Sequence, residues 1–227
     1  MIDPQAHACY NSAMEITYLG RSCFKIRGKQ ATVITDPFSP EVGYSLGKQT
    51  ADVVTVSHAH FDHSYTQGIS GSPRILNRPG EYEVAGVLVI GLPSFHDREK
   101  GAERGANIIF VMEMEEVSIC HLGDLGHPLS DAQVEEIGKV DVLMIPVGGV
   151  YTLNAQAAAA TMRQLEPRIV LPMHYQAGLF SADLEPLDNF LRETSVHDLV
   201  PQPKLNVTKS NLPLTMQVVQ LDFQSAR

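Results

Sequence analysis

The chain has 227 residues, 44% of them hydrophobic and 19% charged, with a formal net charge of -9 and a pI near 5.4. That length can bury a sizeable core as one large domain or two small ones, and the composition argues against a fibrous or disordered protein. The acidic balance leaves no basic stripe for a nucleic-acid backbone, so we expect a small-molecule substrate and no nucleic-acid partner.

Residues 1–13 are mixed and aperiodic, and we expect a flexible leader there, followed by a single domain over 14–227. Apolar runs bounded by turn residues predict strands over 15–20, 22–26, 31–35, 52–57, 74–76, 84–90, 107–112 and 117–121. Helices are predicted over 130–137, 154–165 and 183–193, with strands over 142–146, 168–172, 204–209 and 214–222. Strands followed by helix–strand alternation favour one α/β domain with two packed sheets and outer helices.

A dense cluster of metal-ligating groups, His58-Ala59-His60-Phe61-Asp62-His63, follows the predicted strand over 52–57. On an extended segment His58 and His60 point to the same side and could share one ion. Asp62 and His63 follow a change of backbone direction and could reach a second ion. The spacing therefore predicts a metal site with two ions, in preference to an exposed histidine-rich loop that binds nothing.

Three later residues lie just past predicted strands and could complete the coordination: His96, Asp124 and His174. Each is weak evidence alone, since a single histidine is more often structural. Together they lie at strand ends, where α/β proteins gather their ligands. The other histidines lack this placement and are expected to be structural: His7, His121, His127 and His197.

Taken together, these residues resemble the metallo-β-lactamase superfamily, whose HxHxDH motif is matched in full at 58–63. The resemblance implies a four-layer αββα sandwich with a metal pair at the edge of two sheets. Carried over by position, it assigns the first ion to His58, His60 and His96, the second ion to Asp62, His63 and His174, and a bridge to Asp124. Asp36 resembles an inner acid that orients the ligands, although a plain Asp-Pro turn is the alternative.

Within the superfamily, residues 18–20, 148–152 and 173–175 look most like the compact branch that includes ascorbate-6-phosphate lactonase and many uncharacterised hydrolases. That branch often has histidine at the position of Arg21, so Arg21 either contacts an anionic substrate group or lies on the surface. The oxygen-reducing di-iron branch uses HxExDH and does not fit. The exported zinc β-lactamases and the nuclease branches also fit poorly, for lack of a signal and of a nucleic-acid module.

The resemblance implies a metal-dependent hydrolase that activates water, with Asp62 and Asp124 as catalytic residues and an ester or lactone as substrate. Tyr151 and Tyr175 could stabilise oxyanion charge, or could be packing residues. A phosphodiesterase of the same fold and a non-catalytic metal-binding or ligand-sensing protein are the alternatives. The expected cofactors are two divalent ions, with Zn²⁺ the default and Mn²⁺, Ni²⁺, Fe²⁺ or Co²⁺ also compatible with the ligands.

The cysteines Cys9, Cys23 and Cys120 are odd in number and have no CxxC spacing, which indicates neither a disulfide framework nor a zinc knuckle. The first residues lack a signal-peptide pattern, and no apolar run approaches the roughly 18 residues of a membrane span. We therefore expect a cytoplasmic protein without a membrane partner. A homo-oligomer is compatible with the sequence.

Overall fold

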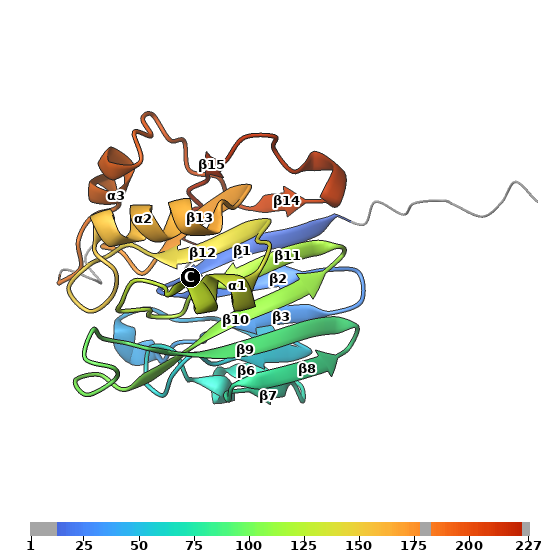
Figure 1. The fold of residues 1–227 in the computed structure, drawn as a ribbon. Coiled ribbons are helices and arrows are strands. Elements are labelled where there is room, and N and C mark those ends of the chain that lie inside the picture. The colour runs from blue at the N-terminus through green and yellow to red at the C-terminus, as the bar shows by residue number, and fades with distance from the viewer. Residues whose placement is uncertain (1–12, 178–182, 224–227) are drawn as a thin grey trace, which may run out of the picture.

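A six-stranded sheet and a seven-stranded sheet pack face to face in the computed structural model, which describes residues 13–177 and 183–223 (Figure 1). The first sheet has the order β14 (Leu205–Val207), β1 (Met14–Gly20), β2 (Cys23–Arg27), β3 (Thr32–Thr35), β5 (Val53–Thr55), β7 (Arg74–Leu76). The second has the order β15 (Gln217–Val218), β13 (Ile169–Met173), β12 (Val142–Pro146), β11 (Val117–His121), β10 (Ala106–Met114), β9 (Val87–Phe95), β8 (Gly80–Val84). The leader expected over 1–13 lies outside the described residues, apart from Ala13.

The directions of the strands determine where functional side chains from the two sheets can come together. In the first sheet β1 and β2 are antiparallel, as are β2 and β3, while β3 and β5 are parallel, so β1, β3 and β5 all run the same way. In the second sheet β9, β11, β12 and β13 share one direction by the same reasoning. The backbone N–H of His174 after β13 donates to the carbonyl of Arg21 after β1 at 2.9 Å. The carboxyl ends of both sheets therefore meet at one edge.

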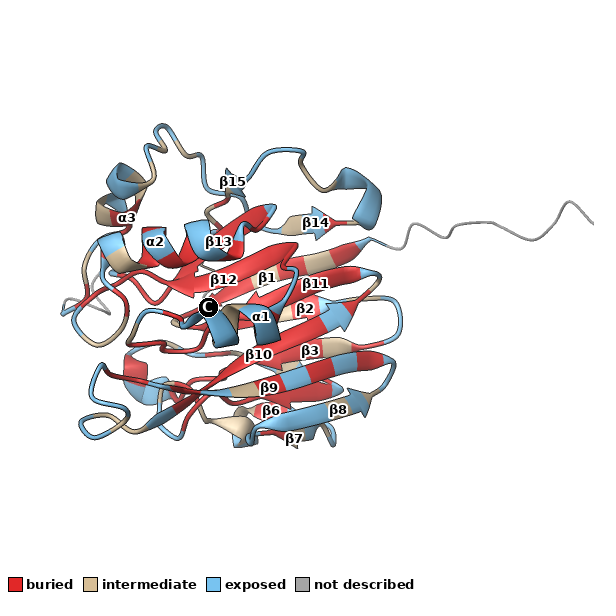
Figure 2. Cartoon of the chain, viewed as in Figure 1, coloured by how far each residue is buried: buried red, intermediate tan, exposed pale blue. Residues whose placement is uncertain are grey.

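The main core lies between the two sheets, where alternate side chains of each strand point inward. Ile16 and Phe24 of the first sheet share one buried cluster with Phe110 and Met144 of the second. Figure 2 shows the corresponding buried positions along the central strands. This core fixes the two sheets against each other and so fixes the edge where they meet.

The outer faces are covered in two different ways. The helices α1 (Asp131–Ile137), α2 (Ala155–Leu165) and α3 (Leu187–Glu193) carry side chains into a second cluster with β11, β12 and β13, in which Ala158 and Ala159 are fully buried. The outer face of the first sheet packs against Val42 of η1 (Pro40–Val42) and Ile69 of β6 (Ile69–Ser70). β6 pairs with β4 (Gln49–Thr50) in a small sheet and follows η2 (Thr66–Gly68), which buries no residue. A last short turn, η3 (Lys209–Asn211), follows β14. The expected single-domain layered α/β fold is confirmed, with 3₁₀ turns rather than α-helices over the first sheet.

Three predicted elements differ most from the structure. The strand predicted over 84–90 is a hairpin of β8 and β9, because Ala85 and Gly86 both have positive φ and reverse the chain. The helix predicted over 183–193 begins at Leu187, after Pro186 in extended conformation. Within 214–222 only Gln217–Val218 forms a strand. Among the described residues, no helix is long and apolar enough to cross a membrane.

Candidate metal centre

The predicted ligands meet at the shared edge of the two sheets because each follows a strand that ends there. The motif at 58–63 follows β5, His96 follows β9, Asp124 follows β11 and His174 follows β13. His58, His63, His96, Asp124 and His174 are buried, Asp62 is half-buried and His60 is exposed. One end of the ligand set is therefore accessible from solvent, while the other is enclosed by protein.

The Asp124 carboxylate is the centre of this cluster. Its Oδ2 lies 3.2 Å from the Nε2 atom of His96 and 3.3 Å from those of His63 and His174. The Nε2 atom of His58 is 4.0 Å away. Imidazole nitrogens from both sheets therefore converge on one carboxylate oxygen, which is the arrangement expected of a ligand shared between two ions.

Three groups of possible ligand atoms lie within 4.8 Å of one another: those of His58, His60 and His96, those of Asp62, His63 and His174, and those of Asp36, His58 and His63. The first two are the ligand sets that the family resemblance implies, and the third joins them through Asp36. The geometry thus brings together all seven of the residues expected to bind metal.

Two polar atoms in the cluster indicate that it fits a metal. The Nε2 atoms of His58 and His63 are buried and have no hydrogen-bond partner among the described residues. Leaving such atoms unpaired costs about 1–3 kcal/mol each. Neutral imidazole nitrogens with carboxylate oxygens are ligands for zinc and similar divalent ions, so this donor set suits such an ion.

The protonation states of the histidines also fit a metal site. Burial lowers the pKa of His58, His60 and His174, so their imidazoles are neutral near pH 7 and their nitrogens can donate to a cation. Burial opposes the charging of His63, but the carboxylates of Asp124 and Asp36 outweigh it and raise the pKa of His63 well above its usual range. Metal binding is expected to displace that proton, because a ligand must be deprotonated.

Asp36 lies behind the ligands and holds them in place. Its carboxylate is fully buried and accepts hydrogen bonds from the Ser57 backbone N–H at 2.7 Å and the Ser57 hydroxyl at 2.5 Å. Its Oδ2 also lies 3.0 Å from the Nδ1 atom of His63, which turns the Nε2 atom toward Asp124. These contacts support the orienting role over a plain turn, and they show the interaction that commonly sets the tautomer of a ligating histidine.

Sequence reasoning missed the polar residues that support Asp124. The Ser22 hydroxyl lies 3.3 Å from Asp124 Oδ1, and the Asn107 side chain accepts from the Asp124 backbone N–H at 3.0 Å. His121, expected to be structural, contacts the Ser22 carbonyl through Nε2 at 2.8 Å and accepts from the Gly123 N–H. The available signal was a buried polar residue within an apolar strand, as with Asn107 before Ile108. His127 is half-buried and accepts from the backbone N–H of Phe95 at 3.3 Å, beside the ligand His96 but outside the ligand groups. His197 is exposed, and His7 lies outside the described residues.

The ligands open into a cavity of about 350 Å³ that other predicted residues also line. Arg21 lies in it, with its Nε atom 3.9 Å from Asp62 Oδ2, and so is not a surface residue. Tyr151 lines the cavity as well. Tyr175 does not line it: its ring is buried, stacks on Tyr18 at 6.3 Å and belongs to the cluster beneath the helices. Burial raises the pKa of Tyr175 to about 12, and the structure places it as a packing residue.

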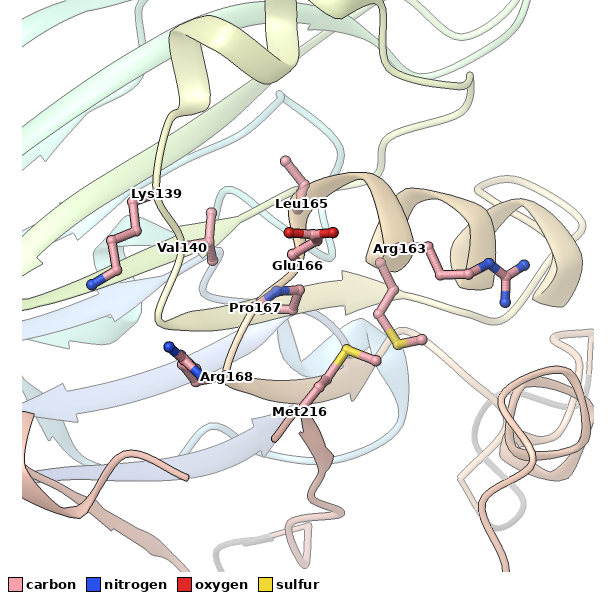
Figure 3. A pocket seen from close by; sticks show the side chains of 9 residues that line it. Lys139, Val140, Arg163, Leu165, Glu166, Pro167, Arg168 and Met216 are labelled. Carbon is pink, nitrogen blue, oxygen red and sulfur yellow. The ribbon is translucent and has the colours of Figure 1, made fainter. Parts of the chain in front are cut away.

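A larger cavity of about 730 Å³ lies elsewhere, at the opposite ends of β12 and β13 (Figure 3). Lys139, Arg168 and Met216 are among its lining residues, and none of the expected metal ligands reaches it. Size alone therefore does not locate the chemistry, which depends on the ligand cluster.

Four residues around the smaller cavity adopt the left-handed backbone conformation that non-glycine residues avoid: Arg21, Asp36, Val150 and His174. For a β-branched residue such as Val150 this is a strong outlier. Such conformations cost of order 1–3 kcal/mol each and cluster at functional sites. The fold tolerates this strain at the edge that holds the ligands.

Gly148 offers a direct test of how tightly this edge is packed. A Cβ at Gly148 would lie 2.0 Å from the backbone oxygen of His174, so Gly148→Ala must displace the His174 backbone. We expect it to lower the free energy of unfolding by about 1–3 kcal/mol, measured by urea denaturation, and to weaken metal binding. Gly71→Ala is the control, since Gly71 has φ 93° and an added Cβ there meets only the Thr50 Cγ2 atom, at 3.6 Å. Equal metal affinity in both variants would contradict the expectation.

The sandwich and the ligand cluster together define a metal-binding protein of the metallo-β-lactamase fold, and comparisons with known proteins agree. Residues 15–174 match the beta-lactamase superfamily domain. A relative from Methanoculleus marisnigri, named UPF0173 metal-dependent hydrolase, is 33% identical over 205 residues, with 79% of this chain and 88% of the relative covered. The chain therefore belongs to the beta-lactamase superfamily and, within it, to the UPF0173 metal-dependent hydrolases.

Solved structures show the same fold. A proposed Zn-dependent hydrolase of the metallo-beta-lactamase superfamily from Thermotoga maritima is 39% identical, with a TM-score of 0.77 and coverage of 92% of this chain and 98% of that one. A metallo hydrolase from Ignicoccus hospitalis is 19% identical, with a TM-score of 0.65 and coverage of 86% and 98%, respectively. The second likeness concerns the fold alone.

Proposed function

We propose that this metal-dependent hydrolase cleaves an ester or lactone bond in a small-molecule substrate, using two divalent ions for which zinc is the first choice. The observation that carries the proposal is the convergence of imidazole nitrogens from both sheets on Asp124 Oδ2, at the base of an open cavity. The description of the Thermotoga maritima structure as a proposed Zn-dependent hydrolase supports zinc. When bound, such ions supply Lewis acidity and lower the pKa of water toward neutrality.

The residues of the chain would bind the metal, transfer a proton and stabilise oxyanion charge. His58, His60 and His96 would hold one ion and Asp62, His63 and His174 the other, with Asp124 shared between them. Asp62 is half-buried at the cavity wall, so one carboxylate oxygen can take up a proton while the other stays a ligand. The Tyr151 hydroxyl is the candidate donor to developing oxyanion charge, because Tyr151 lines the same cavity.

A phosphodiester is the second candidate substrate, and the observation that favours it is the presence of two arginines, Arg21 and Arg104, in the cavity. Guanidinium groups match phosphate geometry well. A non-catalytic metal-binding protein is less well supported, because the exposed His60 and half-buried Asp62 leave the ligands open to the cavity. We place the protein in the cytoplasm, where the free thiols of Cys23 and Cys120 would stay reduced.

The proposal is tested by metal content and substrate panels on one preparation. Protein purified without added metal is expected to contain close to two divalent ions per chain, measured by elemental analysis. A chelator should abolish the hydrolysis of lactones and aryl esters, and Zn²⁺ should restore it. Turnover of bis(p-nitrophenyl) phosphate without ester turnover would select the phosphodiesterase, and loss of both would support a binding protein.

A further inference from the structure

The exposed loop after β9 is held in a fixed conformation by one side chain. The Asp97 carboxylate accepts hydrogen bonds from the backbone N–H groups of Glu99, Gly101, Glu103 and Arg104, at 2.7–3.1 Å. Asp97 directly follows the ligand His96, so the same loop is anchored at the metal centre.

Arg104 is the charged residue that this loop presents. Its guanidinium lies over the ring of Tyr151, 3.9 Å from the ring centroid, in a cation–π contact. Arg104 lines the metal cavity and also a neighbouring cavity of about 420 Å³, and His96 and Tyr151 line both cavities as well. In residues 13–177 and 183–223 Arg104 forms no ion pair, whereas Arg21 lies close to Asp62.

We infer that Arg104 is a specificity-determining residue that binds an oxyanion of the substrate, either a carboxylate or a phosphate, at a distance from the bond that is cleaved. The inference rests on the proposed function, because it assigns Arg104 to the substrate of that hydrolase. The guanidinium is held by a clamped loop and by an aromatic ring, so little freedom is lost when it binds an anion. A chain of net charge -9 repels anions overall, so a cation within the cavity, such as the Arg104 guanidinium, favours the binding of an anionic substrate.

The strain beside Tyr151 supports this role over a solvated surface arginine. Val150 has φ 46° and is exposed, so nothing in the core requires its left-handed conformation. Its consequence is the placement of the next residue, Tyr151, under the Arg104 guanidinium. The strained turn after β12 supplies the Tyr151 ring, and the clamped loop after β9 supplies the Arg104 guanidinium that lies over it.

Binding, rather than turnover, provides the test. Zinc-loaded full-length protein is titrated calorimetrically with phenyl phosphate, phenylacetate and the neutral phenylacetamide. We expect at least one anion to bind, and Arg104→Met to weaken it by about tenfold to a hundredfold, as for loss of a hydrogen bond to a charged group. Arg98→Met is the matched control, because Arg98 lies in the same loop but lines only the neighbouring cavity; its affinity should stay within about twofold of wild type.

The possible outcomes distinguish anion binding by Arg104 from the proposed ester hydrolysis. The anion that loses affinity in Arg104→Met identifies the carboxylate or the phosphate as the recognised group. Failure of both anions to bind wild type, or an equal loss in Arg98→Met or with phenylacetamide, overturns the assignment. Arg104→Gln serves as a second variant if Arg104→Met fails to fold. Absence of ester turnover with the binding difference intact supports Arg104 and counts only against the proposed reaction.

Discussion

Asp124→Asn is expected to reduce hydrolysis by roughly a thousandfold, because it removes the negative charge on which the ligands converge. Asparagine keeps the shape of the side chain but presents an amide to imidazoles 3.2–4.0 Å away. The metal content should fall below that of wild type, measured by elemental analysis of protein purified in parallel. Full metal content with full activity would rule out Asp124 as the shared ligand.

Asp141→Asn is the control for loss of a buried acid. Asp141 is as buried as Asp124, accepts from the Ser118 N–H and pairs with Lys209. It precedes β12, however, and so lies at the opposite end of the strands from the ligands. This variant should lose stability and keep its metal. A drop in metal content in both variants would indicate a general folding defect rather than the loss of a ligand.

Asp36→Asn is expected to have the largest effect on folding. Its carboxylate is fully buried, accepts hydrogen bonds from the backbone N–H and the hydroxyl of Ser57, and contacts His63. Losing one partner of a buried pair costs about 3–5 kcal/mol, and losing a residue that orients a ligand weakens metal affinity by about tenfold to a hundredfold. Urea denaturation of metal-free protein measures the first effect, and competition with a chromogenic chelator measures the second.

Ser57→Ala separates the two effects of Asp36→Asn. It removes a hydroxyl that donates to Asp36 at 2.5 Å and lies 2.9 Å from the Nδ1 atom of His58, and it leaves the contact between Asp36 and His63 in place. We expect a loss of about 1–3 kcal/mol in unfolding free energy and a smaller change in metal affinity than in Asp36→Asn. If Ser57→Ala weakens metal binding as much as Asp36→Asn, the contact between Asp36 and His63 does not by itself account for the loss, and the contact of the Ser57 hydroxyl with His58 contributes.

The sequence was sufficient to predict the layered fold and the convergence of the candidate ligands at one site, because both depend on local patterns. Apolar runs predicted most strands, and His96, Asp124 and His174 were found by their position just after them. The hairpin at Ala85 and Gly86 was missed, since a glycine within an apolar run is compatible with a continuous strand.

Residues whose roles depend on distant contacts could not be predicted in this way. Asn107 supports Asp124 from another strand, and only the packed sheet brings the two together. Tyr175 and Tyr151 each follow a strand at the same edge, but the first turns into the core and the second toward the cavity. Arg104 could not be singled out from the sequence, because it lies in a loop rich in charged residues. Only in the folded chain do Asp97 and Tyr151 fix its position.

The origin of the ligands in both sheets has a thermodynamic consequence. The motif at 58–63 belongs to the first sheet, whereas His96, Asp124 and His174 belong to the second. An ion held by both sets is a cross-link between the two halves of the sandwich, and by mass action each tenfold rise in free metal above the dissociation constant adds about 1.4 kcal/mol to stability. Substitutions that change the metal affinity of the centre therefore also change the free energy of unfolding of the sandwich at a given concentration of free metal.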